Sequence, residues 1–87
     1  MPILSQFYGI IIKMYFQQSE HNPPHIHATY SGYMAEFNIR TGRILEGKLP
    51  PKEMAMVKIW IKLHREELLK IWETQDFEKI APLKRKE

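Results

Sequence analysis

The chain has 87 residues, of which 44% are hydrophobic and 11% aromatic, so it can form one small folded core. It has no cysteine, which excludes disulfide bonds and thiolate metal sites, and its net charge of +3 suits an acidic partner such as nucleic acid. The N-terminal apolar run is too short to span a bilayer and lacks a secretory-signal pattern. We therefore expect a cytoplasmic protein with no membrane association.

The first predicted element is a strand over residues 8–16. Apolar side chains alternate along it and would form one apolar face, made of Tyr8, Ile10, Ile12, Met14 and Phe16. Polar residues 17–22 follow as a loop. Pro23 and Pro24 then hold the chain in an extended conformation, because each proline fixes its own φ.

A hairpin is predicted next, with strands over 25–30 and 33–39 and a two-residue turn at Ser31-Gly32. Counting outward from this turn gives a register with one consistently apolar face, on which Tyr30 faces Tyr33, Ala28 faces Ala35 and Ile26 faces Phe37. On the opposite face the same register places His27 against Glu36 and His25 against Asn38.

The next turn contains Arg40, Thr41 and Gly42, and it suits a three-residue loop with the glycine in the left-handed conformation. Phe37 would then face Leu45, and Glu36 would face Glu46. This register collects polar side chains on one face of a small antiparallel sheet: His25, His27, Glu36, Asn38, Glu46 and Lys48.

A long helix is predicted over residues 52–73, with Pro51 at its first position. Its apolar stripe consists of Met56, Val57, Trp60, Ile61, Leu68, Ile71 and Trp72. His64 lies within the stripe, where a core histidine bonded to the backbone is the usual case. Residues from Thr74 onward are expected to form a short turn and a loose end with the basic residues 84–86.

These elements predict a single α+β domain, in which a small antiparallel sheet of three to four strands packs against one long C-terminal helix. The sheet would occupy residues 1–49, the helix 50–75, and the turn and basic tail 76–87. The oligomeric state, including a homo-oligomer, stays open.

Two titratable groups held side by side can perform acid–base catalysis. In this interpretation His27 is a general base oriented by Glu36, and His25 is a general acid. Nearby cations would hold a phosphate group, and the candidates are Lys13, Arg43 and Lys48. Metal-independent cleavage of RNA, without a cofactor, is the reaction that such a site would perform.

Two alternatives remain open. In the first, His25 and His27 bind a divalent metal such as zinc, because residues two apart on a strand point to the same side. His21 would fold back across the proline loop, and Glu36 would supply a fourth ligand. In the second, the protein is not an enzyme, and the histidines and prolines of this loop form a docking surface for a partner.

The strings "PPHIHA" and "LEGKLP", together with the helix sequence "LHREELLKIWE", resemble the small prokaryotic family catalogued as domain-of-unknown-function 4160. The resemblance covers residues 3 to about 80 and singles out Pro24, His25, His27 and the string Gly47-Lys48-Leu49-Pro50. It implies a bacterial cytoplasmic protein that acts with a small partner of the domain-of-unknown-function 2442 type. Such pairs are suspected of being toxin–antitoxin modules, and the protein would be the toxin-like member, acting on RNA.

Overall fold

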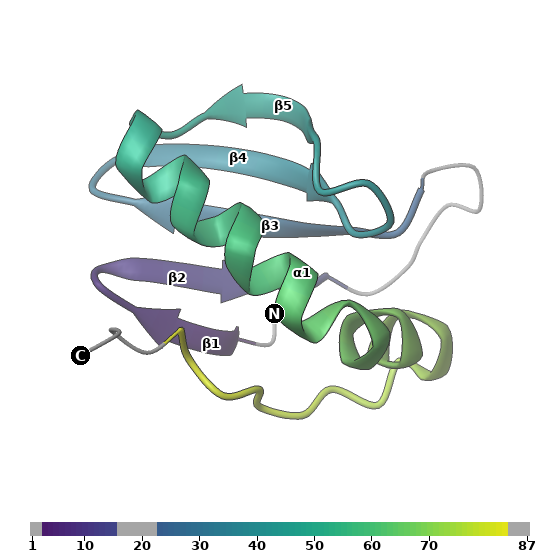
Figure 1. The fold of residues 1–87 in the computed structure, drawn as a ribbon. Coiled ribbons are helices and arrows are strands. Elements are labelled where there is room, and N and C mark those ends of the chain that lie inside the picture. The colour runs from purple at the N-terminus through teal and green to yellow at the C-terminus, as the bar shows by residue number, and fades with distance from the viewer. Residues whose placement is uncertain (1–2, 16–22, 84–87) are drawn as a thin grey trace.

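The computed structural model describes residues 3–15 and 23–83, which form a five-stranded antiparallel sheet with one long helix across it (Figure 1). The strands lie side by side in their sequence order. The elements are β1 (Ile3–Phe7), β2 (Ile10–Lys13), β3 (His25–Tyr30), β4 (Tyr33–Asn38), β5 (Ile44–Lys48) and α1 (Pro51–Thr74). The predicted α+β class is confirmed, although the expected number of strands was too low.

The additional strand comes from the N-terminal region, which forms a hairpin instead of one strand. Tyr8 and Gly9 connect β1 to β2, and both have positive φ (51° and 82°), as the central residues of a type I′ turn do. The alternating apolar residues after the turn are fully buried, as predicted: Ile10, Ile12 and Met14. Tyr8, however, is 42% exposed, and Phe16 lies outside the described residues. The predicted single strand over 8–16 is therefore wrong.

The predicted hairpin of β3 and β4 is confirmed. Tyr30 pairs with Tyr33 next to the turn, and the register continues through every pair expected from the sequence. Ala28, Ala35, Ile26 and Phe37 are fully buried on the face that α1 covers. The pairs on the other face are His27 with Glu36 and His25 with Asn38.

The pairing of β4 with β5 agrees with the sequence in one part and differs in another. Gly42 has the expected positive φ (77°), and Glu36 faces Glu46 as predicted. A shift in register then places Phe37 opposite Ile44 instead of Leu45. Leu45 is 44% exposed, because the extra residue moves it out of the apolar row.

Helix α1 begins at Pro51, as predicted, and ends at Thr74; the next residue, Gln75, is the C-cap and has a left-handed conformation. Its predicted apolar stripe packs against the sheet. The buried members are Val57, Trp60, Ile61, Leu68, Ile71 and Trp72, and Met56 is half-buried.

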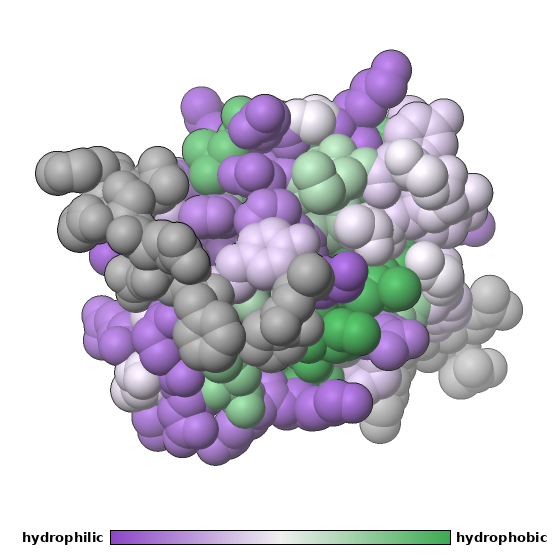
Figure 2. Space-filling model, turned by 180° about the vertical axis from the view of Figure 1, so that it is seen from behind, coloured by the Kyte–Doolittle hydropathy of each residue, from purple (hydrophilic) through white to green (hydrophobic). Residues whose placement is uncertain are grey.

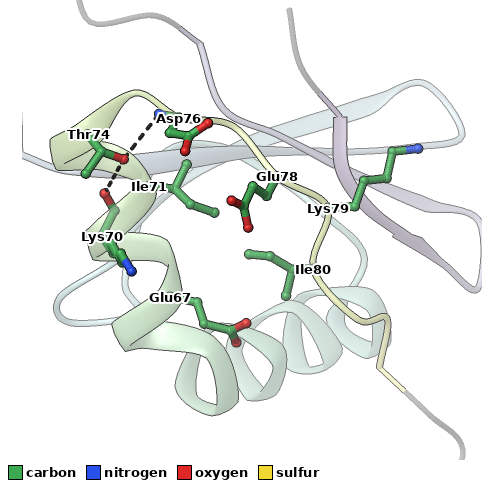
Figure 3. A pocket seen from close by; sticks show the side chains of 8 residues that line it. All are labelled: Glu67, Lys70, Ile71, Thr74, Asp76, Glu78, Lys79 and Ile80. Carbon is green, nitrogen blue, oxygen red and sulfur yellow. Dashed lines mark hydrogen bonds between the residues drawn. The ribbon is translucent and has the colours of Figure 1, made fainter.

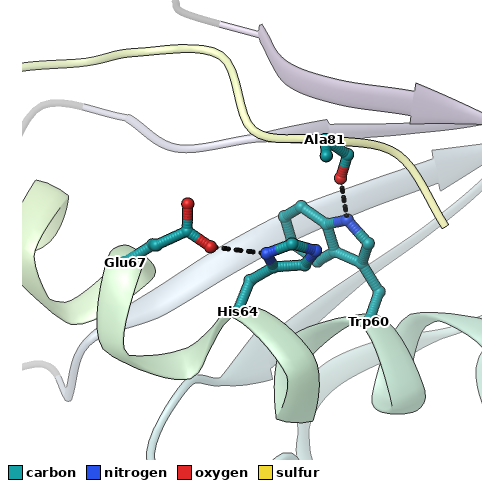
Figure 4. Close-up of polar contacts among 4 residues, drawn as sticks. All are labelled: Trp60, His64, Glu67 and Ala81. Atoms are coloured by element: carbon teal, nitrogen blue, oxygen red, sulfur yellow. Dashed lines mark hydrogen bonds and ion pairs between the residues drawn. The ribbon is translucent and has the colours of Figure 1, made fainter.

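The helix is bent at His64, whose φ and ψ (−118° and 21°) are not helical. The bend directs the second half of α1 toward the end of the sheet where β3 begins (Figure 1). His64 is half-buried, and its Nδ1 pairs with the Glu67 carboxylate at 2.5 Å (Figure 4). The expectation of a core histidine bonded to the backbone is therefore wrong.

Residues after α1 return alongside β1 (Figure 1). The Ile80 N–H donates to the Leu4 carbonyl at 2.7 Å, and the indole N–H of Trp60 donates to the Ala81 carbonyl at 2.9 Å (Figure 4). Ile80 is also buried. The prediction of a loose end after the helix is therefore wrong for the described residues up to Leu83. The basic residues 84–86 lie outside the described residues. Within the described ranges, no helix has the length and apolar character needed to cross a membrane.

Candidate functional site

The face of the sheet opposite α1 carries a row of titratable side chains. Because neighbouring strands pair in register, Lys13 on β2, His27 on β3, Glu36 on β4 and Glu46 on β5 follow one another across four strands. Figure 2 shows this side of the molecule, where hydrophilic residues predominate and apolar residues form small patches. The row therefore runs from a cation, through an imidazole, to two carboxylates.

His25, His27 and Glu36 converge in the middle of this face, and we call them the histidine cluster. The Nε2 atom of His27 lies 3.2 Å from the Oε2 atom of Glu36. The rings of His25 and His27 are 5.3 Å apart between centroids. One potential ligand atom from each of the three residues lies within 4.8 Å of the other two. The structure thus brings together the three residues that the sequence proposed as a site.

Two aromatic rings enclose the cluster. Tyr15, just beyond β2, packs on His27 with 4.3 Å between ring centroids, and Trp72 packs on His25 with 5.1 Å. His27 is only 7% exposed, while Glu36 and His25 are half-buried and accessible. Tyr15 lies on this face because it follows Lys13 by two residues and side chains alternate along an extended chain. The position of Trp72 depends on the bend in α1, for which the sequence offered no signal.

The ring orientation of His25 is set by the backbone of the proline segment. Its Nδ1 lies 2.9 Å from the carbonyl oxygen of Pro23. Because a carbonyl only accepts hydrogen bonds, this contact requires a proton on Nδ1. In the neutral ring the lone pair then belongs to Nε2. Pro23 and Pro24 therefore limit the chain conformation and also select the tautomer of the next residue.

Burial lowers the pKa of His27 below its ordinary value of 6.5. The carboxylate of Glu36 opposes this effect, while the positive charges of His25 and Lys13 add to it. His27 is therefore neutral at pH 7. Its Nδ1 is buried and has no hydrogen-bond partner among the described residues.

The remaining predicted site residues lie at different distances from the cluster. Lys13 is half-buried and lies opposite His27 where β2 pairs with β3. Lys48 lies on β5, two strands from His27. Arg43 is exposed in the loop before β5, where its carbonyl accepts a hydrogen bond from the Asn38 N–H at 2.8 Å. His21 lies outside the described residues, as does most of the loop proposed as a docking surface.

A separate pocket lies between the last turns of α1 and the segment that follows the helix (Figure 3). Glu67, Asp76 and Glu78 line it together with Ile71 and Ile80, and it shares no residue with the histidine cluster. This pocket is therefore not part of the candidate site, which is the partly open histidine cluster.

The model of the domain-of-unknown-function family DUF4160 matches residues 9–73. The chain belongs to this family. The matched part contains strands β2 to β5 and nearly all of α1, so it includes the histidine cluster and the two aromatic rings that enclose it, whereas β1 lies outside the match. The comparisons with curated proteins and with solved structures found no match.

Proposed function

We propose that this protein binds a divalent transition metal through His25, His27 and Glu36. The observation that carries the proposal is the convergence of two imidazoles and one carboxylate, with potential ligand atoms within 4.8 Å of one another. Two histidines and one carboxylate are a ligand set used by catalytic zinc sites and by non-haem iron sites, and the set leaves coordination positions open.

The dimensions of the cluster suit a metal. With metal–ligand bonds of about 2.0–2.2 Å, two ligands of a tetrahedral zinc ion lie roughly 3.4 Å apart. The His27–Glu36 separation of 3.2 Å is already close to this value. Two ligand atoms that lie 4.8 Å apart would have to approach each other by about 1.4 Å to reach the separation found at zinc, and a side-chain rotation provides such a shift.

The hydrogen bond of His25 and the lowered pKa of His27 also suit metal ligands. Metal-binding histidines commonly donate their second ring N–H to a backbone carbonyl, and His25 makes this contact with Pro23. A ligand imidazole must be neutral, and burial keeps His27 neutral at pH 7. A bound metal would supply Lewis-acid activation of a water molecule or a substrate oxygen.

Metal binding is tested by titrating the purified, untagged protein with Co²⁺ and following its visible absorption, and by calorimetry with Zn²⁺. We expect one ion per chain and a loss of affinity of at least about 100-fold in Glu36→Gln and in His25→Ala. His64→Ala is a matched control, because His64 also pairs with a glutamate but lies outside the cluster. Equal affinity of the wild-type protein and Glu36→Gln would refute the proposal.

We propose as a second candidate that the protein cleaves RNA as the toxin-like member of a two-protein module. The charge of Lys13 acts directly on His27, so one cation is available to hold a phosphate beside the cluster, and Lys48 lies on the same face two strands away. The half-buried His25 is better placed than the enclosed His27 to exchange protons with a substrate.

Expression in a bacterial host tests this candidate. The wild-type protein is expected to slow growth and to shorten RNA in vitro, while the double variant His25→Ala/His27→Ala does neither. Adding a chelator separates the two mechanisms, because cleavage through a metal centre stops and metal-independent acid–base cleavage continues. Unchanged growth inhibition and cleavage in the double variant would eliminate this function.

A further inference from the structure

The outer side of α1 carries an exposed apolar row on the side of the molecule opposite the histidine cluster. Ile59 is 52% exposed and Leu63 is 65% exposed. They are four residues apart, so their side chains are neighbours on the helix surface. Half-buried Met56 extends this apolar surface toward the N-terminus of α1. In Figure 1 the first half of α1 crosses the sheet, and no described segment lies over its outer side.

A row of positive charge runs beside the apolar row. Lys58 and Lys62 are also four residues apart and exposed, and Lys52 adds a third exposed cation in the first turn. The acidic residue in this part of the helix, Glu53, is buried. Across residues 51–63 the exposed charges are therefore all positive, and the exposed acidic residues Glu66 and Glu67 follow only in the next turn.

We propose that this face binds an amphipathic helix of another protein, whose apolar residues cover Ile59 and Leu63 and whose acidic residues pair with Lys58 and Lys62. Helices commonly recognise partners through apolar side chains spaced by three and four residues, and the flanking charges then determine which partner binds. The inference is independent of the proposed metal site.

Two other occupants fit the surface less well. A nucleic acid would pair its phosphates with the lysines but would gain nothing from Ile59 and Leu63, the two most exposed large apolar side chains among the described residues. In a second copy of this chain, antiparallel pairing of Ile59 with Leu63 would bring Lys58 close to Lys62 of the other copy, and like charges repel.

The size and place of the surface define the kind of complex. From Met56 to Leu63 the helix rises by roughly 11 Å, or about two turns, so the contact would be small and reversible unless the partner extends beyond it. The second half of α1, beyond the bend at His64, carries the Trp72 that packs on His25, but the proposed surface lies on the first half. A helix bound to Ile59 and Leu63 would therefore leave the histidine cluster accessible.

The test uses three synthetic 18-residue peptides in fluorescence polarisation. The first has leucines at helical spacing flanked by glutamates, the second has lysines in place of the glutamates, and the third has serines in place of the leucines. We expect only the first to bind, more weakly at high salt. Leu63→Ser should lower its affinity by about tenfold or more. Leu45→Ser is the matched control, since it removes an exposed leucine from β5 and should bind normally.

Charge reversal adds an outcome that a change in folding would not produce. Lys58→Glu/Lys62→Glu should lose the glutamate-flanked peptide and gain the lysine-flanked one, with an unchanged circular-dichroism spectrum. Equal binding of all three peptides, binding of none, or unaltered binding by Leu63→Ser would overturn the proposal. It would also be overturned by self-association that Leu63→Ser abolishes, or by RNA binding that depends on Lys58 and Lys62.

Discussion

The substitution Gly47→Ala should destabilise the protein far more than Gly32→Ala, although the two glycines have similar backbone conformations. Their φ angles are +78° and +88°. A Cβ atom on Gly47 would lie 2.2 Å from the carbonyl oxygen of Met34 and 3.0 Å from the Cα of Ala35, both on the neighbouring strand β4. A Cβ atom on Gly32 would meet nothing within 4 Å.

The difference between the two variants isolates the steric effect. Both variants place an alanine at positive φ, which costs about 1–2 kcal/mol. In Gly47→Ala the obstructing atoms belong to the backbone of β4, so no side-chain rotation relieves the overlap. β5 must then move away from β4, and the weakened pairing should cost about 2 kcal/mol more. For a domain of this size that corresponds to a melting temperature lower by a further 8–16 °C, roughly.

Thermal unfolding of both variants and the wild-type protein, followed by circular dichroism, measures this difference. NMR shifts of Glu46 and Lys48, which flank Gly47 on β5, would report the expected local displacement. Melting temperatures of the two variants within about 3 °C of each other would refute the steric argument, since the strain of positive φ is common to both.

Three further predictions follow from single contacts. Burial lowers the pKa of His27 in the folded state, so the unfolded chain binds the extra proton more readily. The stability of the metal-free protein should therefore be full above pH 6.5 and should fall as the pH drops below 6.5 toward the lower folded pKa. In chemical denaturation at several pH values, His27→Gln should flatten this dependence. Trp60→Phe removes the hydrogen bond to the Ala81 carbonyl. We expect faster amide exchange over residues 78–83 and a free energy of unfolding lower by about 0.5–1.5 kcal/mol. Unchanged exchange would show that this bond does not hold the segment. The Nε–H of Arg65 donates to the Ile39 carbonyl at 2.9 Å, so replacing Arg65 by methionine should cost about 1–3 kcal/mol in urea unfolding, and a cost below about 0.5 kcal/mol would contradict this assignment.

The hairpin and the composition of its two faces could be predicted because they depend on local rules. Ser31-Gly32 is a two-residue turn, and from there the alternation of side chains fixes every partner along β3 and β4. The same counting places His25, His27 and Glu36 on one face, where the structure has them. The start of α1 at Pro51 also follows from a local preference, since proline lacks the N–H that a first helical turn leaves unpaired.

Prediction failed where the local pattern allowed more than one arrangement. The alternation through Ile10 and Ile12 is the same in one long strand and in the second strand of a hairpin. Tyr8 is moreover a residue that seldom adopts the positive φ which the turn requires. The register beyond Glu36 failed for a related reason, because a bulge inserts one residue without changing the composition of the strand.

The sequence by itself determined which residues form the histidine cluster, because strand pairing and side-chain alternation are properties of neighbouring residues. The tertiary structure decided how that cluster is enclosed. Trp72 reaches His25 because α1 bends at His64, and Tyr15 covers His27 because the end of β2 lies beside β3. These contacts join residues far apart in the chain, so burial, and with it the neutral state of His27, depends on packing that no local pattern specifies.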